Sequence, residues 1–245
     1  MWILYPQRMN WFECIDGHTC GNPCRLVVSG APELEGQSLA EQRLDFLKKH
    51  DWVRKGLMFE PRGHDAMSGV ILRPPMRDDC DVGFLFIEVS GCLPMCGHDT
   101  IAATTYVIER QLVTPRVPGV LSIETPAGRV DAAYDLVDGR VEQVCFRNVA
   151  SYLHKAGVAV DVPNLGTVTL DVSYGGNFYA IVEPQATWSG LDDWPPSRLL
   201  TVSDAVRTAA QDAVQPIHPE DERIRGVSHV MWCDEVKRPE FLGGF

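Results

Sequence analysis

The sequence contains no apolar stretch that approaches the roughly 20 residues needed for a membrane-spanning helix. Its first residues, Met1 to Tyr5, also lack the basic segment and the full apolar segment of a secretory leader. We therefore expect a cytoplasmic protein with no membrane partner. In that compartment its eight cysteines should be reduced, so each is core filler, a metal ligand or a catalytic thiol.

Basic residues are also scarce. The 245 residues include 22 Lys and Arg against 33 Asp and Glu, which gives a net charge of −11. This charge opposes binding to nucleic acid, although acidity of this size is also an ordinary aid to solubility. Because 45% of the residues are hydrophobic, the chain can bury a substantial core as one large or two modest domains.

Low-complexity segments, short repeats and Gly/Ser linkers are absent, so compact structure is expected from about Trp11 onward. Apolar or alternating runs between Gly and Pro residues predict the following strands: 11–15, 25–28, 69–72, 83–89, 128–136, 141–146, 167–172 and 178–182. The Asp138-Gly139 pair predicts a hairpin between two of them. A last apolar run follows at 226–233.

Three helices are expected among these strands. Ser38 and Glu41 form a capping-box pattern at the start of a helix that runs to His50. Further helices are predicted at 96–110 and from Ser203 to Val214, and the β-branched residues of the first of these require tertiary packing. Strands on either side of a buried helix favour an α+β fold over a parallel Rossmann sheet.

Cys96 is the strongest candidate for a catalytic residue. It stands at the predicted start of a helix, where the macrodipole and free N–H groups favour an anion, so its thiolate should be accessible. The N–H groups of Gly97, His98 and Asp99 can bind a carboxylate, which would place a substrate α-carbon beside the sulfur. A buried structural cysteine is the alternative.

Three other segments carry polar groups at turns. Residues 18–24 join two strands and can bind a polar ligand, or they form a β-turn stabilised by Asn-Pro. The charged residues of 60–65 form a site wall or, as we prefer from the residues alone, an internal ion-pair loop. The two glycines in 174–179 indicate a close backbone approach to a ligand or, equally, a hairpin turn.

Taken in order, four segments resemble the signatures of the proline racemase family. They read Asp-Gly-His-Thr-Cys-Gly-Asn-Pro at 16–23, Glu-Pro-Arg-Gly-His at 60–64, Met-Cys-Gly-His at 95–98 and Tyr-Gly-Gly-Asn-Phe-Tyr at 174–179. The first segment, together with Ser-Gly-Cys at 90–92, favours the hydroxyproline epimerase branch. The resemblance extends from Met9 to about Trp232.

The resemblance implies a fold like that of diaminopimelate epimerase, with two similar domains at 9–125 and 126–245, each a sheet wrapped around a central helix. It implies inversion of the α-carbon of 4-hydroxyproline, or of a similar imino acid, with no cofactor and no metal. Cys96 would be one of two thiols on opposite sides of that carbon. Gly97 and His98 would hold the substrate carboxylate, and His229 would contact the substrate. A homodimer is left open.

The sequence departs from the family pattern at the second thiol. The family places that thiol in an Asp-Arg-Ser-Pro-Cys-Gly-Thr-Gly-Thr segment, which does not occur among these 245 residues. Neither Cys145 nor Cys233 precedes a glycine turn that would aim it at a substrate. The residues at 237–245 resemble a truncated or frame-shifted end, so the second domain is expected to be incomplete.

Other readings remain open from the residues alone. Cys96 could serve alone in the dehydration of trans-3-hydroxyproline, or the chain could be a non-catalytic remnant. Cys92, Cys96 and His98 are also spaced closely enough to bind a metal ion. Asp99 stands where the family usually has glycine, and there it should either repel an anionic substrate or cap the helix.

Overall fold

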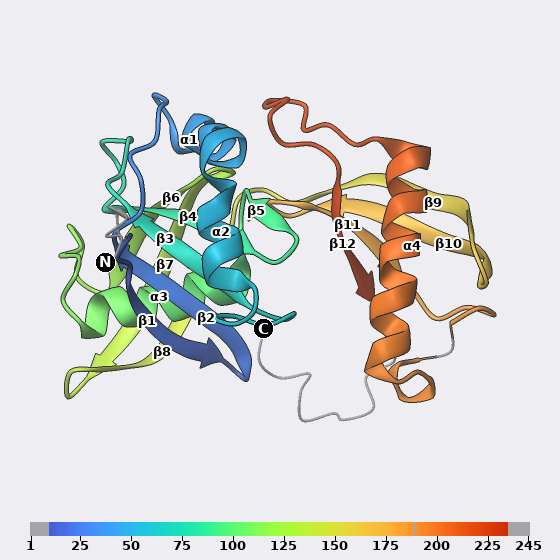
Figure 1. Ribbon diagram of the computed structural model, residues 1–245, viewed down its shortest axis with the longest axis horizontal. Coiled ribbons are helices and arrows are strands. Elements are labelled where there is room, and N and C mark those ends of the chain that lie inside the picture. Colours follow the sequence, from blue (N-terminus) through green and yellow to red (C-terminus); the bar gives the residue numbers. More distant parts are fainter. Residues whose placement is uncertain (1–9, 189, 235–245) are drawn as a thin grey trace, which may run out of the picture. The chain divides into compact units, whose positions relative to one another are not determined.

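The computed structural model describes residues 10–188 and 190–234, so the expected frame-shifted end at 237–245 lies outside the described residues. The chain divides into two compact units, Met1–Val149 and Ala150–Phe245, whose elements are labelled in Figure 1. In the described part of the chain, no helix combines the length and the apolar character needed to span a membrane.

An eight-stranded sheet forms the first unit. Its strands are β1 (Glu13–Thr19), β2 (Asn22–Ser29), β3 (Ser68–Arg73), β4 (Val82–Glu88), β5 (Gly91–Leu93), β6 (Val120–Thr125), β7 (Gly128–Val137) and β8 (Arg140–Arg147). They follow the order β1-β2-β3-β4-β6-β7-β8, and β5 pairs with β4. The helices are α1 (Leu39–Asp45), the π-helical η1 (Phe46–His50), α2 (Asp51–Met58) and α3 (Gly97–Glu109).

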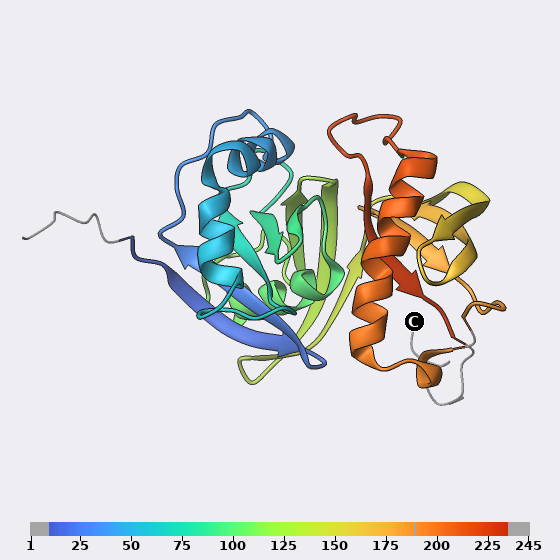
Figure 2. The same cartoon turned by 45° about the vertical axis from the view of Figure 1, so that its right-hand side comes forward.

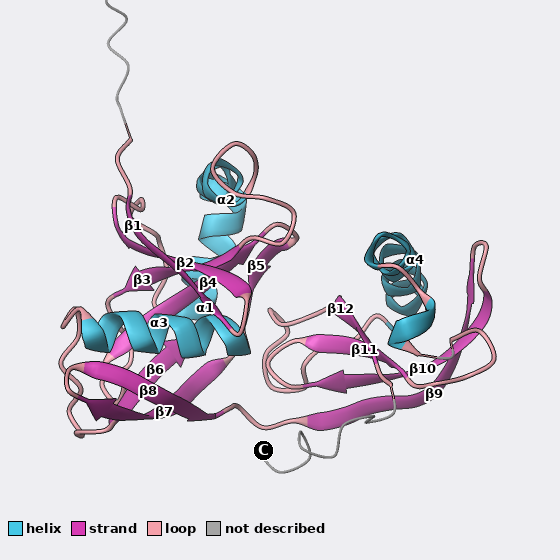
Figure 3. Ribbon diagram, turned by 90° about the horizontal axis from the view of Figure 1, so that it is seen from below, coloured by secondary structure: helices cyan, strands magenta, loops and turns pink. Residues whose placement is uncertain are grey.

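The sheet of the first unit curls around α3. This helix packs against β1, β2 and β3 and also against β7 and β8, and Figure 3 shows it between the two ends of the sheet. Ala102, Ala103 and Val107 are buried in this contact, as are the polar Thr100 and Thr104. β-Branched residues make an isolated helix less stable, and packing against the sheet compensates for this loss. The predicted α+β fold, with a sheet around a central helix, is confirmed.

The central strands of the first unit are buried on both faces. Neighbouring residues of β2, Leu26 and Val27, belong to different apolar clusters, because successive side chains of a strand point to opposite faces. Phe84 and Leu85 in β4 likewise belong to different clusters. The cluster on one face surrounds α3, and the other includes Phe46 of η1 together with Val53 of α2.

The first predicted helix begins where expected and ends later. Ser38 caps it and its side-chain oxygen accepts a hydrogen bond from the Glu41 N–H at 3.2 Å. Beyond Asp45 the chain passes through the π-helical η1 into α2 and ends at Met58 rather than at His50. A π-helical turn shifts the phase of the apolar residues, which explains why the sequence pattern breaks near His50.

The second unit is a four-stranded sheet with one long helix. Its elements are β9 (Tyr152–Val162), β10 (Gly166–Tyr174), β11 (Phe178–Val182), the short 3-10 helix η2 (Leu191–Asp193), α4 (Pro196–Val214) and β12 (Val227–Trp232). The strand order is β12-β11-β10-β9, and α4 crosses all four strands, as Figure 2 shows. That this unit is incomplete remains a prediction.

The boundary between the units differs from the expected one. The sequence places it between 125 and 126, but β7 pairs with β6 through six residue pairs from Val120↔Ala133 to Thr125↔Gly128, and β8 then pairs with β7. These ladders hold 126–149 in the first sheet, so the structure divides after Val149.

Helix α4 also begins earlier than predicted, at Pro196, a residue type that favours the first helical position.

Candidate active site

Cys96 lies where the sequence predicts, at the residue that precedes the first turn of α3. Its backbone is extended (φ −142°, ψ 122°), and its carbonyl oxygen accepts a hydrogen bond from Thr100 Oγ1 at 2.6 Å. The side chain is only 9% exposed and packs in the cluster around α3. The expectation of an accessible thiol is therefore wrong, because the curled sheet covers the helix start.

Burial also decides the protonation of Cys96. Removal from water raises the pKa of the thiol well above its ordinary value, and the neighbouring Asp99 carboxylate raises it further. The Asp99 N–H at the helix start acts in the opposite direction and is outweighed. The helix terminus therefore does not produce a thiolate by itself, and ionisation of Cys96 requires a nearby base.

His98 offers such a base. Its Nδ1 lies 3.3 Å from Cys96 Sγ, and its Nε2 lies 3.2 Å from Asp99 Oδ1. Burial alone would lower the pKa of His98, but the Asp99 carboxylate and the Pro23 carbonyl together raise it above its usual value. The imidazole thus connects the thiol to a carboxylate, an arrangement that can take up a proton from sulfur.

Asp99 neither faces solvent nor caps the helix. Its side chain is fully buried, and Oδ2 accepts a hydrogen bond from Ser68 Oγ in β3. The thiol of Cys24 in β2 is hydrogen-bonded to the same carboxylate. Burial, together with Asp99, raises the pKa of this second thiol far above its ordinary range. Neither Ser68 nor Cys24 carries a sequence signal for this contact, since only the curled sheet brings β2 and β3 against the helix start.

The hairpin at 18–24 is joined to this helix start. Thr19 Oγ1 donates a hydrogen bond to the His98 carbonyl at 2.9 Å, which brings the first and third family segments together. The turn itself consists of Cys20 and Gly21, both with positive φ (47° and 92°), as a tight two-residue hairpin requires. The predicted turn between two strands is confirmed.

Arg25 connects the hairpin to the loop at 60–65. Its guanidinium donates to both carboxylate oxygens of Asp16 at 2.8 and 2.7 Å, and also to the carbonyls of Leu57 and Arg62 at 2.7 and 2.8 Å. The side chain of Arg62 donates to the carbonyl of Gly56. The preferred ion pair within the loop is therefore wrong, because the loop is held by main-chain carbonyls. A cavity of about 650 Å³ adjoins Arg25 and Arg62.

In the second unit, the segment 174–179 forms a hairpin turn. Tyr174 pairs with Phe178, and the Gly175 N–H donates to the Asn177 carbonyl at 3.0 Å. His229 lies in β12, where its ring stacks on Tyr179 at a centroid distance of 5.2 Å. Its Nδ1 is 2.9 Å from Ser228 Oγ. The expected contact of His229 with the substrate remains a prediction.

Of the three residues expected to bind a metal ion together, Cys92 does not lie beside Cys96. Cys92 is buried in the cluster on the opposite face of the sheet, so its thiol cannot act with Cys96 and His98. The group that the structure brings together is Cys96, His98 and Asp99, whose ligand atoms all lie within 4.8 Å of one another. Every cysteine of the chain is a free thiol.

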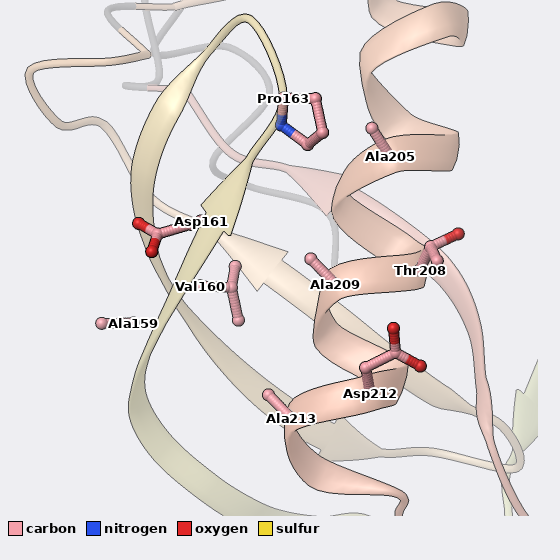
Figure 4. Close-up of a pocket in the computed structure, with 9 residues that line it drawn as sticks. All are labelled: Ala159, Val160, Asp161, Pro163, Ala205, Thr208, Ala209, Asp212 and Ala213. Atoms are coloured by element: carbon pink, nitrogen blue, oxygen red, sulfur yellow. The ribbon is translucent and has the colours of Figure 1, made fainter.

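A second hollow lies between β9 and α4, with a volume of about 670 Å³. Figure 4 shows Ala205, Ala209 and Ala213 along the helix, with Val160 pointing toward it from β9. Its polar side chains are Asp161, Asp212 and Thr208. Among the described residues, the lining of this groove includes neither a thiol nor an imidazole.

Comparison with known proteins supports an epimerase fold. The structure matches a crystal structure of a hydroxyproline epimerase from Agrobacterium vitis with bound trans-4-OH-L-proline, with a TM-score of 0.84 and 27% identity over 95% of this chain and 69% of that one. A family model described as proline racemase matches residues 14–242. The chain belongs to the proline racemase family.

Two curated relatives give the position within the family. The chain is 60% identical over 223 residues to 4-hydroxyproline 2-epimerase 2 of Rhizobium rhizogenes, covering 91% of this chain and 67% of the relative. It is 53% identical over 229 residues to 4-hydroxyproline 2-epimerase of Ancylobacter novellus, covering 94% and 69%. The chain therefore spans about two thirds of the length of these relatives.

Proposed function

We propose that the protein is a cofactor-independent epimerase that inverts the α-carbon of 4-hydroxyproline. The observation that carries this proposal is the Cys96 thiol at the start of α3 with the His98 ring 3.3 Å away. The identity of 60% to a relative named 4-hydroxyproline 2-epimerase 2 supports the choice of substrate. We also propose a cytoplasmic location, which suits eight free thiols, and leave a homodimer open.

The first turn of α3 would hold the substrate. The N–H groups at the start of a helix have no partner within it, so those of Gly97 and His98 can bind a carboxylate. Removal of the α-proton makes the carboxylate carry more negative charge, which these fixed donors stabilise. His229 in β12 is proposed as a further substrate-binding residue.

His98 would prepare Cys96 for this step. The Asp99 carboxylate favours the imidazole form with its proton on Nε2, which leaves Nδ1 free to accept the proton of the Cys96 thiol. The resulting thiolate takes the α-proton from one face of the carbon. Because burial raises the pKa of Cys96, the local base matters more here than at an exposed thiol.

Inversion also needs an acid on the opposite face of the α-carbon. These 245 residues contain no Asp-Arg-Ser-Pro-Cys-Gly segment, so Cys96 supplies only one face. A proton taken by Cys96 would exchange with solvent and return to the same face. We therefore expect this chain, used as it stands, to exchange the α-proton of one hydroxyproline stereoisomer with little net inversion.

The test is NMR in deuterium oxide, following the α-proton of each stereoisomer and the appearance of its epimer. We expect the signal of one isomer to disappear, this loss to stop in Cys96→Ser, and the control Cys145→Ser to behave like the parent chain. Absence of exchange in both isomers by a folded chain would refute the assignment of Cys96. Rapid epimer formation would instead reveal a second acid.

Dehydration of trans-3-hydroxyproline is a second candidate function, because this reaction needs only one thiol. There, Cys96 would remove the α-proton and the 3-hydroxyl would leave as water, so no second face is required. The same spectrometer, with trans-3-hydroxyproline as the substrate, detects the unsaturated product. Turnover of this substrate without exchange in the 4-hydroxy isomers would select the dehydratase.

A further inference from the structure

We propose that a cavity of the first unit binds a small aromatic carboxylate. The cavity has a volume of about 650 Å³ and is lined by residues of the edge strand β1, of helix α2 and of the loop that carries Arg62. This size falls within the range of about 300–1,000 Å³ that is typical of ligand pockets in proteins. The proposal concerns binding alone and does not depend on the reaction proposed above.

The cavity is separate from the Cys96 site. Phe12 and Cys14, which line the cavity, pack against the apolar cluster that contains Val53 of α2. The next residue, Ile15, packs instead against the cluster around α3 that contains Cys96. Successive side chains of a strand point to opposite faces of its sheet. The cavity therefore lies on the face opposite Cys96, and a ligand there would not occupy the space beside the thiol.

Aromatic rings form one wall of the cavity. Phe12 and Trp52 meet edge to face, with a centroid distance of 6.1 Å and an interplanar angle of 63°. Trp52 is nevertheless 47% exposed, and Trp11, which also lines the cavity, is 77% exposed. Contact between aromatic rings is favourable beyond the apolar area that it buries. These two exposed indoles therefore favour a ligand with a planar aromatic body.

The charges of the cavity favour an anion. Arg25 donates to both carboxylate oxygens of Asp16, at 2.8 and 2.7 Å, so these two charges balance each other. Arg62 donates through Nε to the carbonyl of Gly56, but its terminal nitrogens make no hydrogen bond or ion pair with any residue in the described part of the chain. A guanidinium binds a carboxylate through two parallel hydrogen bonds. Arg62 thus selects a carboxylate as the polar group of the ligand.

Gly56 provides an independent indication that this space is kept open. It stands inside α2 and lines the cavity, although glycine makes a helix interior less stable than alanine does. A Cβ atom at this position would meet no heavy atom within 4 Å beyond the neighbouring backbone. Close packing therefore does not require glycine here. The missing side chain instead leaves room beside Arg62, where the carboxylate would bind.

The experiment is calorimetric titration of the 245-residue chain with 2-naphthoate, and with 2-naphthamide as its uncharged counterpart of the same shape. We expect one molecule of 2-naphthoate per chain. The amide should bind roughly tenfold more weakly, because it cannot form a charge-assisted pair with Arg62. Absence of 2-naphthoate binding to the folded chain, or equal affinities for the acid and the amide, would overturn the proposal.

Two pairs of variants locate the binding. Gly56→Leu should fill the cavity and abolish binding, whereas the matched control Gly56→Ala should bind as the parent chain does. Arg62→Gln should weaken binding of 2-naphthoate roughly tenfold, whereas Arg110→Gln removes an exposed arginine elsewhere in the first unit and should have no effect. Unchanged binding in Gly56→Leu or in Arg62→Gln would place the ligand elsewhere and refute the site.

A further measurement avoids substitutions, in case a variant fails to fold. Cys14 lines the cavity and is partly buried, and burial raises the pKa of its thiol, so alkylation is carried out at alkaline pH and mapped by mass spectrometry. Saturating 2-naphthoate should slow labelling of Cys14 several-fold and leave the exposed Cys20 unaffected. Equal labelling of Cys14 with and without 2-naphthoate would contradict the proposal. Because no hydroxyproline is added, failure of the proposed epimerase reaction would not alter these results.

Discussion

The buried hydrogen bond from Ser68 to Asp99 should be one of the strongest single contacts of the first unit. Ser68 is 4% exposed and Asp99 is fully buried, so water cannot replace the hydroxyl in Ser68→Ala. A hydrogen bond to a charged group contributes roughly 1.5–3 kcal/mol, and the carboxylate oxygen left without its donor makes the loss costly. We expect Ser68→Ala to lower the free energy of unfolding by about 2 kcal/mol.

The assay is urea denaturation of Ser68→Ala, Asp99→Asn and the double variant. Because the chain forms two units, pulse alkylation of the buried Cys24 and Cys96 assigns the transition of the first unit. Two residues in contact should show a coupling energy of at least about 1 kcal/mol. Effects that simply add, or a loss below about 0.5 kcal/mol in Ser68→Ala, would refute a hydrogen bond between these side chains.

Two further predictions concern the thiols and the pH. Limited iodoacetamide treatment at neutral pH should label the exposed Cys20 and Cys145 well before the buried Cys96, and early labelling of Cys96 would contradict its burial. Because Asp99 raises the pKa of His98, protonated His98 should stabilise the first unit below about pH 6.5, its unfolded value, and this contribution should disappear as the pH rises through the folded value. Urea midpoints of the parent and Asp99→Asn from about pH 5.5 to pH 8.5 test this, and parallel curves would refute it.

Local sequence signals predicted much of the fold. The Ser38 cap, the Asp138-Gly139 hairpin and the start of α3 depend on residues close in the chain, and all three are present. Strand β9 was missed although Val158, Val160 and Val162 alternate as buried residues, because Lys155 and Gly157 interrupt the preceding pattern. Its Gly157 has a positive φ of 62°, which ordinary strand residues avoid.

The site was only partly predictable for a physical reason. Cys96 and His98 are near in sequence, so their proximity follows from a helix start. Ser68 is 31 positions from Asp99, and the sheet curvature that joins them leaves no local signal. The same curvature buries Cys96, and burial outweighs the helix terminus in setting its pKa. The accessible thiolate expected from the motif alone is therefore wrong.

The two-sided burial of the central strands limits how this protein can vary. In β2, β3 and β4, neighbouring residues such as Leu26 and Val27 supply two different cores. Inserting or deleting one residue within such a strand would send every later side chain to the opposite face, and both cores would exchange members at once. Changes in length among natural relatives should therefore be confined to the connections between strands, such as 30–37 and 110–119, while the strands themselves change only by substitution.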